Sequence, residues 1–141
     1  MDMKKIVLLA FAVWLVAGCH MAENRAVYQS ACYRLGSELN TENVRPGLCR
    51  QVLCYNDDIM LVKVIFGEEM VGQRPDMHSH PHSQSSYVVC GRFEFHCGDT
   101  VMVLGPGDSF LAAPDVPHEA YCLEPGIIID GFSPIRESFI K

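Results

Sequence analysis

Basic residues are scarce in this chain. Its 11 lysines and arginines stand against 17 aspartates and glutamates, so the formal net charge is −6. A chain this acidic lacks the positive field that attracts nucleic acid or anionic lipid. We therefore expect no nucleic acid among its partners.

The sequence also lacks an apolar run of the roughly 20 residues that a membrane-spanning helix needs. The run from Ile6 to Gly18 follows two lysines and is typical of a signal-peptide core. Leu15 to Cys19 resembles the lipobox of bacterial lipoproteins, whose cysteine is lipidated after cleavage. Residues 1–19 are thus predicted to be a signal peptide with a lipobox.

This N-terminal segment predicts a lipoprotein of the periplasm or outer membrane, which touches the membrane only through its lipid anchor. Removing residues 1–18 leaves 9 basic and 16 acidic residues, a net charge of −7. Two alternatives stay open: a generic signal peptide, or a translation start at Met21 that leaves the protein in the cytoplasm.

Cys-x-x-Cys pairs are absent from the sequence, which argues against a structural zinc site. In an exported protein an even number of cysteines permits disulfides, whereas in the cytosol the same residues are small buried thiols. The sequence leaves this open for the cysteines beyond Cys19, which are Cys32, Cys49, Cys54, Cys90, Cys97 and Cys122.

The 141 residues suffice for one domain with a single core. Between residues 23 and 39, apolar residues recur with a helical period, which predicts one short amphipathic helix. We read residues 40–47 as a linker, so that residues 20–47 form the N-terminal helix and linker and residues 48–141 form the folded domain.

Beyond Gly47 the pattern changes to short alternating runs separated by Gly, Pro, Asn and Asp, which predict strands. Such strands at close spacing indicate an all-β protein, a β-barrel or double-sheet jelly roll. The expected strands span residues 48–55, 59–66, 85–90, 92–97, 100–104, 109–113, 118–123 and 127–132.

Four residues in two places form a candidate metal site. His78 and His80 lie two apart, so an extended strand points both imidazoles to one face. Gln84 has the same parity, and His118 follows a turn-rich segment. Because all four are neutral, a bound cation would keep its charge, which favours an anionic substrate and Lewis-acid chemistry. His82 is expected beside the ligands or in solvent, and His96 on the surface.

Asp130 stands in the apolar run Ile127 to Phe132, where alternation places it on one face with Ile128 and Phe132. A lone buried carboxylate costs several kcal/mol and has a raised pKa, which suits a general acid or base. The alternative is a structural aspartate paired to Arg136. That arginine could equally bind a substrate carboxylate or stand in solvent.

The spacing Gly-x5-His-x-His-x3-Gln-x6-Gly, followed by Pro-Gly-Asp and Pro-Asp-Val-Pro-His, resembles the two motifs of the cupin superfamily over residues 44 to 141. Two positions depart from the common pattern: Gln84 replaces the usual glutamate, and Asp115 a frequent glycine. The resemblance implies a single-domain cupin barrel, the double-stranded β-helix or jelly roll.

Longer segments, among them His78 to Gln84 and Asp130 to Arg136, resemble the KdgF family, the small cupins of pectin and alginate breakdown. The resemblance implies a divalent metal (nickel, zinc, iron or manganese) held by His78, His80, Gln84 and His118. It implies a catalytic group of Asp130, Phe132 and Arg136. A homodimer is a further expectation that rests on the family alone.

The family converts 4,5-unsaturated uronates into linear 4-deoxy-5-keto uronates, so the implied partner is a small anionic sugar. In this reading Asp130 moves protons, Phe132 packs against the sugar and Arg136 binds its carboxylate. Two other functions are considered: a cupin dioxygenase, and a non-catalytic sugar- or metal-binding lipoprotein.

Overall fold

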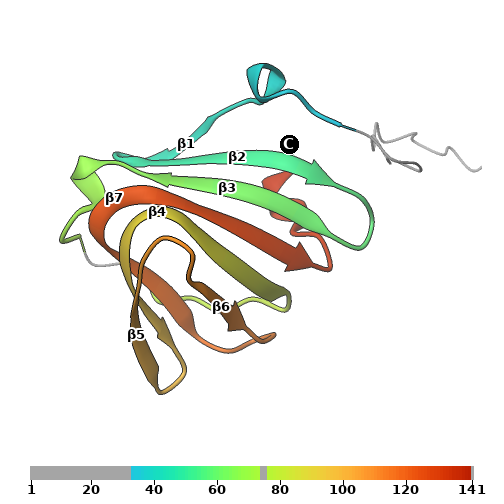
Figure 1. Cartoon of the computed structure of the whole chain (residues 1–141). Coiled ribbons are helices and arrows are strands. Elements are labelled where there is room, and N and C mark those ends of the chain that lie inside the picture. Colours follow the sequence, from blue (N-terminus) through green and yellow to red (C-terminus); the bar gives the residue numbers. More distant parts are fainter. Residues whose placement is uncertain (1–32, 74–75, 141) are drawn as a thin grey trace, which may run out of the picture.

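The computed structural model describes residues 33–73 and 76–140, which form seven strands and three short 3-10 helices (Figure 1). The strands make one antiparallel sheet in the order β1-β2-β3-β7-β4-β5, and β6 pairs with β4. The all-β class predicted from the sequence is confirmed. The strands are β1 (Glu42–Arg45), β2 (Leu48–Tyr55), β3 (Met60–Phe66), β4 (Ser83–Cys97), β5 (Thr100–Leu104), β6 (Ser109–Ala112) and β7 (His118–Ser133).

The 3-10 helices are η1 (Gly36–Glu38), η2 (Glu68–Met70) and η3 (Glu137–Phe139). The predicted lipobox, and most of the helix predicted over residues 23–39, lie outside the described residues. In the described part of that segment, η1 is the one helical turn. No helix in the described ranges has the length and apolar character to span a membrane.

The expectation of a linker over residues 40–47 was wrong, because β1 lies within it and pairs antiparallel with β2. Its sequence, Glu-Asn-Val-Arg, is too polar to look like a strand by composition. The strand forms because β2 offers an unpaired edge and because Glu42 stands directly opposite Arg50, at a Glu42 Oε2–Arg50 Nη2 distance of 2.6 Å. Opposite charges across a strand pair stabilise the pairing.

The hairpin between β2 and β3 forms where the sequence predicts it. Asn56 accepts hydrogen bonds at its Oδ1 from the backbone amides of Asp58 and Ile59, each at 2.9 Å. An asparagine side chain that bonds the backbone two residues on mimics a turn. The two strands then pair from Tyr55 and Met60 back to Leu48 and Phe66.

The segments predicted as two strands on either side of Gly91 are one strand, β4, and those on either side of Gly126 are one strand, β7. The two strands pair along their length, and their register shifts around Gly91. Both strands curve sharply together (Figure 1). The glycines therefore bend two long strands where the sequence suggested that each strand ends.

Close backbone approach explains why glycine occupies both positions. A Cβ added to Gly126 would lie 2.1 Å from the Cys90 carbonyl oxygen and 2.6 Å from the Gly91 Cα. Gly91 itself has a φ of +87°, a conformation that side chains disfavour. The bend therefore requires glycine at positions 91 and 126.

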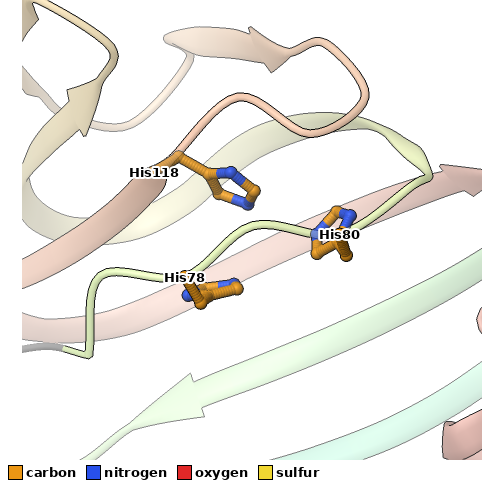
Figure 2. A group of neighbouring side chains, drawn as sticks. All are labelled: His78, His80 and His118. Carbon is orange, nitrogen blue, oxygen red and sulfur yellow. The ribbon is translucent and has the colours of Figure 1, made fainter.

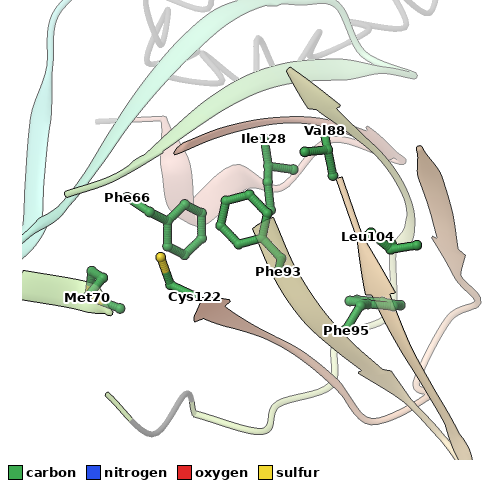
Figure 3. Close-up of a cluster of buried hydrophobic side chains, with 8 residues drawn as sticks. All are labelled: Phe66, Met70, Val88, Phe93, Phe95, Leu104, Cys122 and Ile128. Atoms are coloured by element: carbon green, nitrogen blue, oxygen red, sulfur yellow. The ribbon is translucent and has the colours of Figure 1, made fainter. Parts of the chain in front are cut away.

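Two clusters of buried side chains fill the interior. The larger lies between the halves of the bent strands and contains an edge-to-face pair of Phe66 and Phe93, with ring centroids 4.9 Å apart (Figure 3). Phe93 and Phe95 point inward from β4, as their alternation predicts. The smaller cluster consists of Met60, Val62, Phe132 and Ile135.

The described cysteines are all free thiols in this structure, so disulfides are not part of the described fold. Cys122 is buried, and burial raises the pKa of its thiol. The others are Cys49, Cys54, Cys90 and Cys97.

Substituting Gly126→Ala should lower the free energy of unfolding by about 1–3 kcal/mol, because the new methyl group overlaps the β4 backbone. Urea unfolding measures the change. Gly36→Ala is the control, because a Cβ there meets no atom within 4 Å. Equal stability of the two variants would contradict the close approach described above.

Candidate metal centre

Three histidines meet at one point of the molecule. His78 and His80 lie on the segment that leads into β4, and His118 begins β7; their rings gather around a common space (Figure 2). Ligand nitrogens of the three rings all lie within 4.8 Å of one another. Backbone hydrogen bonds between His78 and His118, at 3.1 and 2.9 Å, fix the two segments to each other.

Gln84 completes the cluster from β4. Its Oε1 lies 3.0 Å from the His80 Nε2 and 3.2 Å from the His118 Nε2. Two atoms that each bind one metal ion at about 2.0–2.1 Å are roughly 3.0–3.4 Å apart at near-right or tetrahedral angles. The spacing in this structure is therefore that of neighbouring metal ligands.

The hydrogen bonds at the outer ring nitrogens also suit a cation. The Nδ1 of His78 donates to the Asp76 carbonyl, and the Nδ1 of His118 donates to the Val116 carbonyl, both at 2.8 Å. Such bonds fix the tautomer and leave Nε2 with a lone pair for a metal. Burial lowers the pKa of His118 and of His80, which favours their neutral forms.

A lone pair of His118 then faces a lone pair of Gln84 at 3.2 Å, which is unfavourable unless a positive charge lies between them. A divalent cation would supply that charge. The residues present therefore fit a metal held by His78, His80, His118 and Gln84. The sequence analysis predicted this set, and the structure brings all four side chains together.

Asp130 lies directly behind this cluster. Its side chain is buried, with 7% of the residue exposed, and it stands opposite Ser86 where β7 pairs with β4. The Gln84 Nε2 donates to Asp130 Oδ1 at 3.2 Å, and the Ser86 hydroxyl donates to the same oxygen. One amide side chain thus joins the histidines to the buried carboxylate.

Burial is the main influence on the pKa of Asp130. Burial raises its pKa to about 6, while the hydrogen bonds from Ser86 and Gln84 and the charge of Arg136 act in the opposite direction. Arg136 makes no direct ion pair with it among the described residues, so the structural pairing considered from the sequence is not formed. Asp130 Oδ2 has no hydrogen-bond partner among them either.

A cavity of about 490 Å³ opens in front of these groups. Asp130, Phe132 and Arg136, the three residues predicted to act on a substrate, all line it, together with metal-cluster residues. Arg136 lies with its guanidinium carbon 5.6 Å from the Phe132 ring centroid. The cavity thus presents the guanidinium group of Arg136, the ring of Phe132 and the buried carboxyl group of Asp130 to a small ligand.

The other two histidines in the described part of the chain, His82 and His96, lie outside the cluster. The His82 ring is 5.2 Å from that of His80 and 6.4 Å from that of Phe132, and it faces a different cavity. His96 is partly exposed on β4, and its Nε2 lies 2.7 Å from a carboxylate oxygen of Glu94.

Two residues at the site were missed from the sequence. Ser86 holds the buried carboxylate, and Arg50 lines the cavity from β2. Each carried a signal: Ser86 has the parity of Gln84, and Arg50 has the parity of the inward residues Leu48 and Val52. In both cases a polar residue stands on the face of its strand that packs toward the interior.

This geometry defines a small β-barrel protein with a ligand-sized cavity beside a histidine-rich candidate metal centre. Residues 67–130 match a family model described as the cupin domain. The pectin degradation protein KdgF of Dickeya dadantii (strain 3937) is 33% identical over 110 residues, which cover 77% of this chain and 97% of that protein.

Two solved structures support the same family assignment. A RmlC-like cupin from Shewanella frigidimarina NCIMB 400 has a TM-score of 0.72 at 41% identity and covers 79% of this chain and 97% of that one. The KdgF from Halomonas sp. has a TM-score of 0.71 at 34% identity, covering 77% and 100%. The chain therefore belongs to the cupin superfamily and, within it, to the family of the pectin degradation protein KdgF.

The His118→Ala variant should bind Zn²⁺ or Ni²⁺ at least roughly tenfold more weakly than the unchanged protein, because one direct ligand is lost. Isothermal titration of the metal-stripped protein measures this. His96→Ala is the control, as it removes a histidine outside the cluster. Unchanged affinity in the His118 variant would contradict the assignment of the centre.

Proposed function

We propose that this protein converts 4,5-unsaturated uronates, as released in pectin or alginate breakdown, into linear 4-deoxy-5-keto uronates. One observation carries the proposal. The buried carboxyl group of Asp130 is linked through Gln84 to the histidine cluster, and both lie at a cavity that Arg136 also lines. The similarity to proteins named for pectin degradation supports the substrate class.

The reaction is an isomerisation, so no co-substrate is needed. The proton leaves the C1 hydroxyl of the ring-closed sugar, and the bond between C1 and the ring oxygen breaks. An aldehyde forms at C1 and an enol or enolate at C5. Protonation at C4 then gives the 5-ketone, and no atom is gained or lost.

Asp130 is the group that moves the proton. Both of its hydrogen bonds are accepted by Oδ1, so Oδ2 is left for the substrate at the cavity wall. Ser86 and Gln84 hold the carboxylate in one orientation, which a proton transfer at a defined carbon requires. A positioned acid–base group of this kind contributes about 10²–10⁴-fold to the rate.

Arg136 receives the substrate carboxylate. Its guanidinium group is held by the rings of Phe132 and Phe139 and makes no ion pair with another described residue. Its N–H donors are therefore available for a planar anion. Phe132 supplies an apolar wall against which a sugar ring can pack.

A divalent cation held by His78, His80, His118 and Gln84 would supply Lewis-acid stabilisation of negative charge on the substrate, since none of these side chains is charged in its neutral form. Removal of the metal separates its contribution to the rate from that of the protein residues.

The compartment and the assembly are proposed separately. The lipobox at Cys19 supports a lipoprotein of the periplasm or outer membrane, and a homodimer is the expected assembly.

The purified protein should speed the loss of the ultraviolet absorbance of unsaturated galacturonate from a lyase digest. A chelator should abolish the acceleration, and added Ni²⁺ or Zn²⁺ should restore it. An oxygen electrode in the same cuvette should record no uptake. Binding of the sugar with its double bond intact would refute the enzymatic proposal, and oxygen uptake would indicate a dioxygenase.

Asp130→Asn should reduce turnover by about 10²–10⁴-fold while the protein keeps its metal, because the amide cannot move a proton. Turnover and metal content are measured on the same sample. Asp99→Asn is the matched control, since Asp99 is exposed and lies outside the cavity. Normal turnover by the Asp130 variant would assign the proton transfer to another group.

A further inference from the structure

A second arginine lines the cavity that holds Arg136. Arg50 lies on β2, and its side chain is 15% exposed. Its Nε and Nη2 donate to the same oxygen of Glu42, at 3.1 and 2.6 Å. Two of the three guanidinium nitrogens are thus occupied by a partner on the neighbouring strand.

The third nitrogen, Nη1, has no hydrogen-bond partner among the described residues and is not sealed within the protein. An arginine fork presents five N–H donors in one plane, and a carboxylate can accept from two of them at once. Because Glu42 accepts hydrogen bonds from Nε and Nη2 of Arg50, the N–H donors of Nη1 point in a fixed direction.

Arg50 and Arg136 share one aromatic ring. Their guanidinium carbons lie 3.5 Å and 4.4 Å from the Phe139 ring centroid, and so within about 8 Å of each other. A carboxylate can bridge two guanidinium groups at this range, since each N–H···O contact spans about 2.7–2.9 Å. Phe139 belongs to η3, so the C-terminal turn sets the spacing of the pair.

Two cations this close repel each other. Burial lowers the pKa of Arg136, and the neighbouring charge of Arg50 lowers it further. Glu42 is the ion-pair partner of Arg50, whereas Arg136 makes no direct ion pair with a described residue and has Asp130 as a neighbouring acidic group. A carboxylate placed between the two guanidinium groups would reduce their mutual repulsion.

We propose that Arg50 binds the carboxylate of the uronate together with Arg136, so that two arginines rather than one select an acidic sugar. This inference rests on the proposed function, because it assigns a further residue to the same substrate. The alternative is that Arg50 serves only as the ion-pair partner that joins β1 to β2.

Three substitutions separate these roles. Arg50→Met removes the donors, and the KM for unsaturated galacturonate should rise about 10- to 100-fold while kcat changes less than about threefold. Arg50→Lys keeps the charge and the pairing with Glu42 but leaves no second nitrogen for the ligand. Its KM should rise nearly as much. Glu42→Gln weakens the same ion pair yet frees Arg50, so its KM should stay equal or fall.

The control is Arg92→Met, which also removes a strand arginine paired to a glutamate, here Glu124 at 3.3 Å, but outside the cavity. It should keep the KM of the unchanged protein. Thermal unfolding and metal content are recorded for every variant, because a merely structural role would change these two quantities.

The inference is overturned by a KM for Arg50→Met equal to that of the Arg92 control, or by restoration of the unchanged KM by Arg50→Lys. Equal increases in KM for Arg50→Met and Glu42→Gln would likewise indicate a structural ion pair. Failure of the proposed function looks different, since the unchanged protein would then show no turnover of the unsaturated uronate.

Discussion

The close contact between the backbones of β4 and β7 is the constraint on which the site depends. His118 and Asp130 are twelve positions apart on β7, which a straight strand would separate by roughly 40 Å. In the structure Gln84 touches both, at 3.2 Å in each case. The strands can fold back this far because Gly91 and Gly126 pass each other without side chains.

The site also solves an electrostatic problem for an acidic protein. Its net charge of −6 would repel an anionic ligand, yet the cavity lining sets three arginines (Arg45, Arg50 and Arg136) against three acidic residues (Asp76, Glu119 and Asp130), beside the neutral metal-ligating groups. Because Gln84 takes the place of a charged ligand, a bound cation keeps its charge. The same amide holds Asp130 through its other end, so one side chain couples the candidate metal centre to the buried carboxyl group.

Local sequence patterns predicted most of the strands and the residues of the candidate site. The parity of Asp130 could be read directly, because alternation along a strand fixes which side chains share a face. The spacing of His78 and His80 also indicated the pair, although both lie ahead of β4 and only His78 forms an isolated bridge, with His118. The length of β4 and β7 could not be read, since Gly91 and Gly126 look like strand ends when their partner is unseen. Cross-strand partners such as Ser86 depend on register, which long-range pairing determines.

Anomalous diffraction from crystals soaked with Zn²⁺ would locate the metal relative to the three histidines and Gln84. The account predicts one metal peak at about 2.0–2.2 Å from nitrogens of His78, His80 and His118 and from the Gln84 Oε1, with the cavity open beside it. A metal bound elsewhere, or a coordination shell that omits Gln84, would contradict the arrangement from which the function is inferred.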